Sequence, residues 1–200
     1  MSGREWGAVL DYWFGGGDPS KRPKWFGGGE AGAQEIREKF GHLVEKARND
    51  ELKHWEDDPK ATLALIILQD QFCRSLYKGT PKSFDRDPYC NMLAKKFLEQ
   101  KTHDHLKMSI SGRLFIYLPI EHSENIDDQK LSVELFKKLQ EDTVGTSEEG
   151  AGKGFLDFAE KHLHIVEKFG RFPARNAAIG RENTPEETEW LANPPAGYSF

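Results

Sequence analysis

Two arginines on a short aromatic turn form the most chemically informative segment of the sequence, FGRFPARN at residues 169–176. Its glycine and proline are typical of a helix end followed by a turn, and its phenylalanines are expected to pin that turn to a core. Arginine suits two-point recognition of a carboxylate or phosphate. The segment therefore predicts either an anion site or a clamp, in which Arg171 and Arg175 bond carboxylates and helix-end carbonyls.

A second polar segment follows the apolar letters LPI and places two carboxylates around an imidazole. Glu121 and Glu124 flank His122 and could orient its ring for proton transfer. The ligand spacing of catalytic zinc helices is absent, so a metal site is disfavoured. Alternatively, Ser123 or Asn125 caps the next helix and the acids complement its dipole, although this leaves the histidine unexplained.

A third polar group extends the most apolar stretch of the chain. Asp70 and Arg74 are four residues apart, so on a helix they share a face and can pair, with Gln71 beside them. Charges at the end of a buried helix need partners or water. The group is interpreted first as an ion pair that ties this helix to a neighbour, and second as the floor of a polar pocket.

Other side chains complete the set of candidates. His162 lies on the apolar face of the helix leading into FGRFPARN, where a lone histidine is more often a hydrogen-bonded core residue than a catalyst. Asn176 and Arg181 follow the turn and extend its polar character. Trp13 and Phe14 could wall a pocket. The stretch that holds His103 and His105 is interpreted as a polar surface loop with incidental metal affinity at most.

Composition narrows the classes of function. The formal net charge is −5, and lysine and arginine are scattered, which disfavours a nucleic-acid partner. The two cysteines match no zinc or CxxC spacing and are expected to be reduced thiols. The longest apolar run, residues 63–68, is too short to cross a bilayer, and the N-terminus lacks a signal-peptide pattern. We expect a cytoplasmic protein with no membrane contact and no cofactor.

Helical periodicity dominates the chain, and no run of residues convincingly predicts a sheet. Capping signals, including the capping box that starts at Thr184, mark several helix starts. The run 113–120 predicts a short helix broken at Pro119, and residues 143–154 predict a polar loop. The pattern predicts one all-α domain over residues 1–200, with seven or eight helices packed as antiparallel hairpins. Its core spans about 6–192, followed by a Pro-rich surface tail.

Several motifs in order resemble domain-of-unknown-function family 924, small helical proteins of bacteria and eukaryotes. They are VLDYWFG, KWFGG, LALIILQDQFCRSLYKGTPKSFDRD, RLFIYLPIEHSE and HLHIVEKFGRFPARNAAIGRENTPEE, within residues 9–190. The resemblance implies an all-α fold similar to tetratricopeptide-like hairpins, and it brings no established reaction. The family's recurrent polar positions correspond here to Asp70, Gln71, Arg74, His122, Ser123, Glu124, His162, Arg171, Arg175, Asn176 and Arg181.

The chain departs from the family pattern at a few positions. Cys73 and Ser75 stand where the family usually has proline and asparagine, and Ala174 stands where it usually has histidine. A mechanism in which the base comes from that turn is therefore disfavoured. His122 and His162 are the imidazoles that remain.

Three functions are consistent with the sequence. The favoured one is a pocket that binds a small polar or anionic molecule, with arginines holding the anion and His122 moving a proton with a neighbouring glutamate. It predicts that Arg74, His122 and Arg175 converge on one pocket. The alternatives are a tetratricopeptide-like module that grips an acidic peptide, and a purely structural network of buried ions. Whether the protein is an enzyme is left open.

Overall fold

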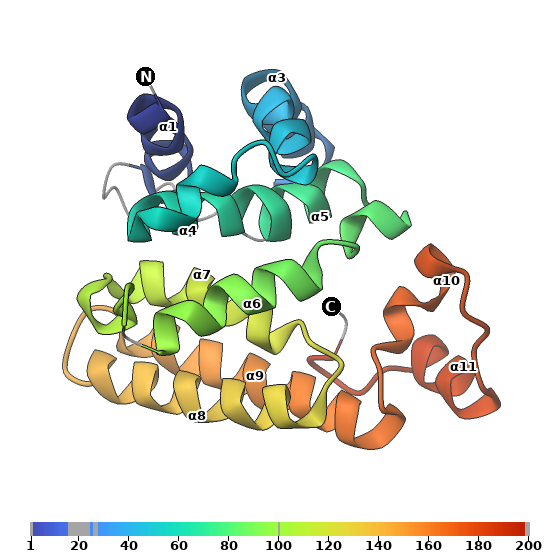
Figure 1. Ribbon diagram of the computed structural model, residues 1–200. Coiled ribbons are helices and arrows are strands. Elements are labelled where there is room, and N and C mark those ends of the chain that lie inside the picture. The colour runs from blue at the N-terminus through green and yellow to red at the C-terminus, as the bar shows by residue number, and fades with distance from the viewer. Residues whose placement is uncertain (1, 16–24, 26–27, 100, 199–200) are drawn as a thin grey trace. The chain divides into compact units, whose positions relative to one another are not determined.

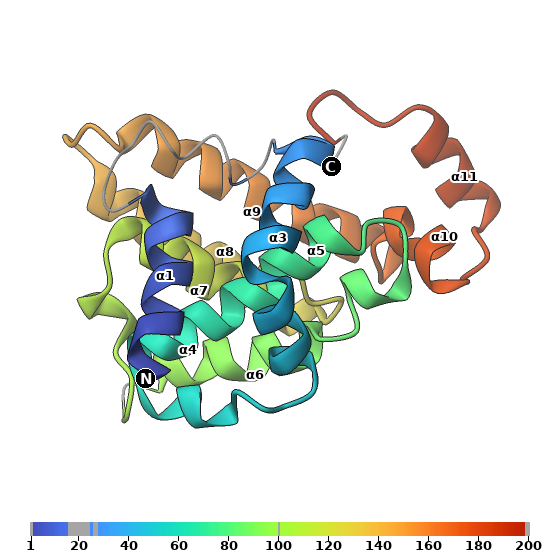
Figure 2. The ribbon, with the colours of Figure 1, turned by 90° about the horizontal axis from the view of Figure 1, so that it is seen from above.

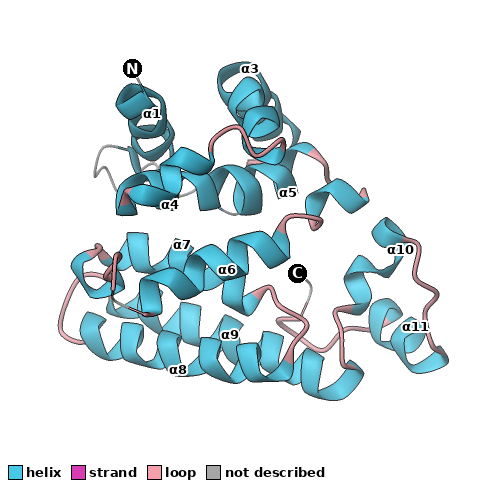
Figure 3. Cartoon of the chain, viewed as in Figure 1, coloured by secondary structure: helices cyan, strands magenta, loops and turns pink. Residues whose placement is uncertain are grey.

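The computed structural model describes residues 2–15, 25, 28–99 and 101–198. Every regular element formed by these residues is helical, which confirms the all-α prediction (Figure 3). The chain divides into two compact units. Unit 1 comprises residues 1–78 and 82–119, and unit 2 comprises residues 79–81 and 120–200.

A buried, nearly continuous helix forms the centre of unit 1. It consists of α4 (Pro59–Ile66), the π-helical segment η4 (Ile67–Phe72) and α5 (Cys73–Leu76). The side chain of Asp58 caps its start by accepting hydrogen bonds from the next free backbone N–H groups. Two further helices pack on it: α1 (Ser2–Phe14) contacts α4, and α3 (Gly29–Arg48) contacts η4 and α5 (Figure 2). The most apolar stretch is thus central, as its all-round hydrophobicity predicted.

Aromatic rings fill the space beside this central helix. The ring of Trp13 lies 5.4 Å from those of Phe72 and Phe115, and its backbone carbonyl accepts a hydrogen bond of 2.7 Å from the indole N–H of Trp25. Phe14 packs edge-on against Phe115 and Trp25. Trp13 is 2% exposed. These contacts place Trp13 and Phe14 in the aromatic core of unit 1.

The remaining helices that begin in unit 1 are η3 (Lys53–Asp57), α6 (Asp87–Leu98), η6 (His105–Lys107) and α7 (Ile110–Glu121). The expected break at Pro119 was wrong, because α7 continues through this residue. Pro119 lies in the last turn, where it removes one backbone hydrogen bond without interrupting a long ladder. The helix thereby reaches Glu121, the first of the acid–base candidates.

The two histidines expected on a surface loop are buried, so that prediction was wrong. His103 Nε2 lies 2.9 Å from Thr62 Oγ1, and His105 Nδ1 lies 2.5 Å from the hydroxyl of Tyr117. Each ring therefore has a hydrogen-bonding partner inside unit 1, which makes its burial tolerable. The sequence did not reveal this burial. Polar neighbours along the chain suggest an exposed loop, whereas the burial of a side chain depends on its tertiary contacts.

Unit 2 is framed by an antiparallel helical hairpin, α8 (Ile126–Thr143) and α9 (Glu149–Phe169), which lie side by side in Figure 1. The predicted loop over residues 143–154 shrinks to 144–148. The longer loop was predicted because this stretch is polar and rich in glycine. A Cβ on Gly152 would lie 2.2 Å from Thr143 Oγ1, so this glycine permits close approach of two helices and does not end one.

The C-terminal part of unit 2 folds back on α9. It contains η7 (Pro173–Arg175), α10 (Asn176–Ile179) and α11 (Pro185–Ala192). Gly170, at φ 68°, ends α9 in the left-handed conformation. Ile165, Val166 and Phe172 form an apolar cluster, against which Trp190 and Tyr198 pack. The turn that carries the arginines is therefore anchored by its own phenylalanine.

Among the described residues, no helix is long and apolar enough to cross a membrane.

Candidate functional site

The polar group of unit 1 forms a closed ion network. Arg74 Nη1 lies 2.8 Å from Asp70 Oδ1, and Arg74 Nη2 lies 2.8 Å from Asp87 Oδ2. The amide of Gln71 donates a 2.6 Å hydrogen bond to the other oxygen of Asp70, which is 0% exposed. Burial opposes the charge of Arg74, but the two carboxylates outweigh it and raise its pKa. These contacts support the interpretation of the group as an internal tie.

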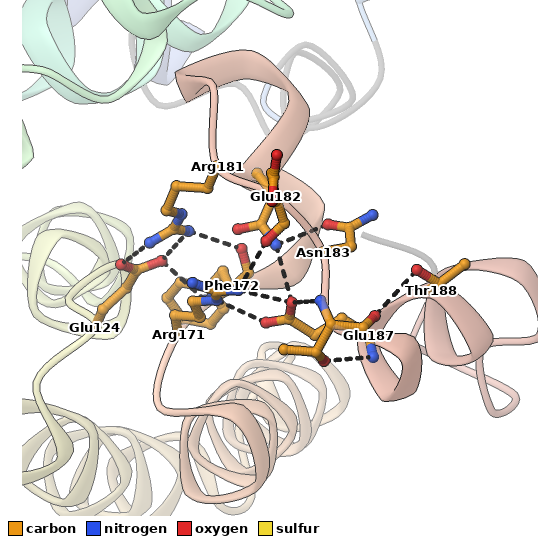
Figure 4. Close-up of polar contacts among 10 residues, drawn as sticks. Glu124, Arg171, Phe172, Arg181, Glu182, Asn183, Glu187 and Thr188 are labelled. Carbon is orange, nitrogen blue, oxygen red and sulfur yellow. Dashed lines mark hydrogen bonds and ion pairs between the residues drawn. The ribbon is translucent and has the colours of Figure 1, made fainter.

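In unit 2 the FGRFPARN turn supplies a second buried ion pair. The guanidinium of Arg171 makes a two-point contact with Glu187, with Nε to Oε1 at 2.6 Å and Nη2 to Oε2 at 2.8 Å (Figure 4). Asn176 and the backbone N–H of Thr184 also donate to Glu187 Oε2. The bond from Arg171 outweighs burial and, with these N–H donors, lowers the pKa of Glu187 to about 2.

A neighbouring pair joins the start of unit 2 to the same turn. Arg181 Nη1 and Nη2 lie 2.7 and 2.8 Å from the two carboxylate oxygens of Glu124 (Figure 4). The backbone N–H of Phe172 donates to Glu124 Oε1 at 2.8 Å, and Arg181 Nη2 donates to the Phe172 carbonyl at 3.2 Å. Burial alone would raise the pKa of Glu124, but these bonds hold it below its usual range.

The third arginine of the region, Arg175, has contacts of another kind. Its guanidinium carbon lies 4.5 Å from the centre of the Phe172 ring, a cation–π geometry. Its Nη2 donates a 2.9 Å hydrogen bond to the backbone carbonyl of His122. Arg175 therefore connects the η7 turn to the segment that follows α7.

An imidazole and a carboxylate meet beside this arginine. His162 Nδ1 lies 2.8 Å from the Phe158 carbonyl and 3.3 Å from Glu121 Oε1. A carbonyl oxygen only accepts, so Nδ1 carries hydrogen and the neutral ring keeps its lone pair on Nε2. The side chains of His162 and Glu121 are 13% and 3% exposed. The ring is thus oriented from one edge and partly reachable by solvent.

Two further ring contacts define the surroundings of His162. The His122 ring lies 6.3 Å away between centroids, and the Phe172 ring meets it edge-on at 5.4 Å. The backbone that carries Glu121 is held by Gln129, whose amide donates to the Glu121 carbonyl at 2.5 Å. Asn125 caps α8 with its side chain, so the capping alternative accounts for Asn125 and leaves the histidine to other contacts.

The structure divides the sequence-predicted residues between the two units. Unit 2 brings together eight of them, namely Glu121, His122, Glu124, His162, Arg171, Arg175, Asn176 and Arg181. Unit 1 holds Trp13, Phe14, Asp70, Gln71 and Arg74. Convergence of Arg74 with His122 and Arg175 stays a prediction. No group of three or more potential metal ligands occurs in the part of the chain that the structure describes.

Three participants were not predicted from the sequence. Asp87 was not among the candidate site residues, yet it pairs with Arg74. Glu187 was assigned only to the capping box, which it does form, but it also neutralises Arg171. Phe172 was interpreted as an anchor, and it also stacks against Arg175 and His162. A capping glutamate close in sequence to several arginines was the signal that could have revealed Glu187.

Comparisons with known proteins give a family and a fold relative. A family model described as "Bacterial protein of unknown function (DUF924)" matches residues 9–195. A solved structure of a protein of unknown function from Agrobacterium tumefaciens is similar, with a TM-score of 0.79 and 31% sequence identity over 96% of this chain and 98% of that chain. No curated protein matches the chain. Neither description names a ligand or a reaction.

Proposed function

We propose a function from the geometry of unit 2 for this chain, which belongs to the DUF924 family of bacterial proteins of unknown function. The protein binds a small polar or anionic molecule at a site formed by Glu121, His122, His162 and Arg175, and acts on it by acid–base chemistry. One observation carries the proposal: the end of α7, helix α9 and the η7 turn bring two imidazoles, a buried carboxylate and a guanidinium together.

Each side chain has a role that its contacts support. Glu121 and the Phe158 carbonyl face the same nitrogen of His162, which leaves Nε2 as the proton acceptor. The nearby His122 is the second imidazole, suited to donate a proton. Arg175 supplies the positive charge that would attract an anion, and its stacking on Phe172 holds the guanidinium plane.

The direct test uses histidine ring signals in nuclear magnetic resonance spectra. We expect inorganic phosphate or acetate, titrated into the protein, to shift the ring signals of His162 and His122. The His162→Gln variant should bind the same anions more weakly. His164→Gln is the matched control, because His164 lies two residues away on α9 and contacts Trp190 and Tyr198 instead. Equal loss in both variants, or shifts confined to other histidines, would contradict the site.

A structural role is the second candidate, and it is favoured for the other arginines. Arg171 and Arg181 each make a two-point pair with a glutamate of the chain, and Arg74 pairs with two buried aspartates. Such side chains act as internal ties. Because Glu124 and Glu187 already occupy two of these guanidinium groups, an acidic peptide is the weaker choice of ligand.

The setting of the protein is part of the same proposal. The α8–α9 hairpin supports a tetratricopeptide-like arrangement of helices. Cys73 and Cys90 are free, buried thiols, which supports a reducing, cytoplasmic compartment. The formal charge of −5 disfavours a nucleic-acid partner.

A further inference from the structure

Both backbone polar groups of Phe172 are held by one ion pair. Glu124 Oε1 accepts the N–H of Phe172 at 2.8 Å, and Arg181 Nη2 donates to its carbonyl at 3.2 Å. The two side chains are joined to each other by bonds of 2.7 and 2.8 Å. Phe172 is therefore held at its peptide groups by residues that lie 48 positions earlier and 9 positions later in the chain, and its carbonyl also accepts the backbone N–H of Arg175 at 3.1 Å.

The ring of Phe172 contacts two side chains of the proposed site. It meets the His162 ring edge-on at 5.4 Å, and the guanidinium of Arg175 lies over it at 4.5 Å. Phe172 is 6% exposed and packs with Ile165 and Val166, so its ring has little room to move. A change at its backbone would displace both polar groups that touch its ring.

We propose that Glu124 and Arg181 are positioning residues for the acid–base site and that they act through Phe172. The consequence for binding rests on the function proposed above, whereas the placement of the His162 ring does not. Glu124 and Arg181 touch neither imidazole in the contacts described, so their effect is indirect.

The chemistry of Arg181 suits this task better than lysine would. Its planar fork reaches both oxygens of Glu124 and the Phe172 carbonyl at once, while an ammonium group offers no such fixed fork. Its buried Nε has no hydrogen-bond acceptor among the described residues. A buried donor without an acceptor costs stability, so stability alone gives a weak reason for this arrangement.

The test compares the same substitution at two arginines of one region. Arg181→Lys should shift the ring-proton signals of His162 without any ligand, because the Phe172 ring current moves. It should also weaken phosphate binding roughly tenfold, since small misplacements of binding groups are costly. Arg171→Lys is the control. Arg171 precedes Phe172 in the chain, but its guanidinium pairs with Glu187 and donates to the Glu182 carbonyl, whereas Glu124 and Arg181 hold the Phe172 peptide groups. It should leave the His162 signals in place and change phosphate affinity less than about twofold.

The outcomes separate the two proposals. Unchanged His162 signals in folded Arg181→Lys protein, or equal shifts in Arg171→Lys, would overturn the positioning role. If wild-type protein shows no response to phosphate, binding of this anion fails as the function, but the ligand-free His162 shift still decides the positioning role. If Arg181→Lys does not fold, Glu124→Gln replaces it, because it keeps the shape of the side chain and removes the charge that pairs with Arg181. Unchanged His162 signals in folded Glu124→Gln protein would overturn the positioning role.

Discussion

The ion network of unit 1 and the C-terminal turn of unit 2 use the same residue types in different ways. In unit 1, Arg74 is enclosed by Asp70 and Asp87, and Asp70 is fully buried. In unit 2, Arg171 and Arg181 pair with glutamates, and Arg175 stacks on a ring and donates to a carbonyl beside two histidines. Both regions therefore contain a cluster of arginine and carboxylate side chains.

The difference shows that the contacts of each guanidinium group, and not the residue types around it, distinguish a structural ion pair from a candidate site. A guanidinium held by two buried carboxylates has its donors and its charge committed inside the protein. A guanidinium placed on a ring beside partly exposed imidazoles combines charge with groups that transfer protons at neutral pH. Substitutions of the two kinds of arginine should therefore diverge, with stability lost when Arg74 is replaced and binding lost when Arg175 is replaced.

The largest effect is expected from Arg74→Ala. The change leaves Asp70 and Asp87 without their shared cation, and should lower the free energy of unfolding by about 3–5 kcal/mol. Urea denaturation followed by tryptophan fluorescence measures it. Lys153→Ala is the control, since it removes an exposed pair with Glu149 and should leave the free energy of unfolding nearly unchanged. A loss below about 1 kcal/mol for Arg74→Ala would remove the basis for calling this network a tie.

Glu187→Gln should have the next largest effect. Glu187 is 1% exposed and accepts from Arg171, Thr184 and Asn176, so loss of its charge should destabilise the protein by roughly 2 kcal/mol. The neighbouring Glu186→Gln provides a control, because Glu186 is exposed and pairs with Lys168 at the surface. Equal midpoints of urea unfolding for the two variants would show that the Arg171 clamp is not a tie.

The pH dependence of stability should sharpen the same contrast. The pKa of Glu187 is about 2 in the folded protein against 4.5 ordinarily. A depressed folded pKa means that the carboxylate stabilises the fold above about pH 4.5, and this contribution fades as the pH falls towards 2. Wild-type and Glu187→Gln stabilities should therefore converge between these values. Parallel curves from pH 7 down to 2 would indicate that Glu187 does not titrate in this way.

Arg175→Ala should have a smaller effect on stability than Arg74→Ala and the largest effect on binding. Its cation–π contact contributes about 0.5–1 kcal/mol and its guanidinium also donates to the His122 carbonyl, so the variant should lose less stability than one that leaves two buried carboxylates without their shared cation. The histidine ring signals of the Arg175→Ala variant should no longer shift when phosphate is added. Arg74→Ala supplies the opposite signature for comparison. If Arg175→Ala lost as much stability as Arg74→Ala, Arg175 would be a structural residue like Arg74, and the proposed difference between the two regions would be contradicted.

Local patterns predicted much of the secondary structure. The helical class and the capping box at Thr184 depend on neighbours within a few residues, and both are present. The errors came where tertiary contacts override local preference. Gly152 lies inside a helix because another helix approaches it, and His103 is buried because Thr62 meets it. Neither partner is near in sequence.

The sequence by itself determined which side chains are available: three arginines around one turn, two histidines and the glutamates beside them. Their periodicity also places His162 on the inner face of α9. Only the tertiary structure decided how they pair, because an ion pair depends on distances of about 3 Å between residues that can lie 50 positions apart. Glu124 with Arg181 and Arg171 with Glu187 are such pairs, and the same folding brings Arg175 beside the segment of His122 and the ring of His122 beside that of His162.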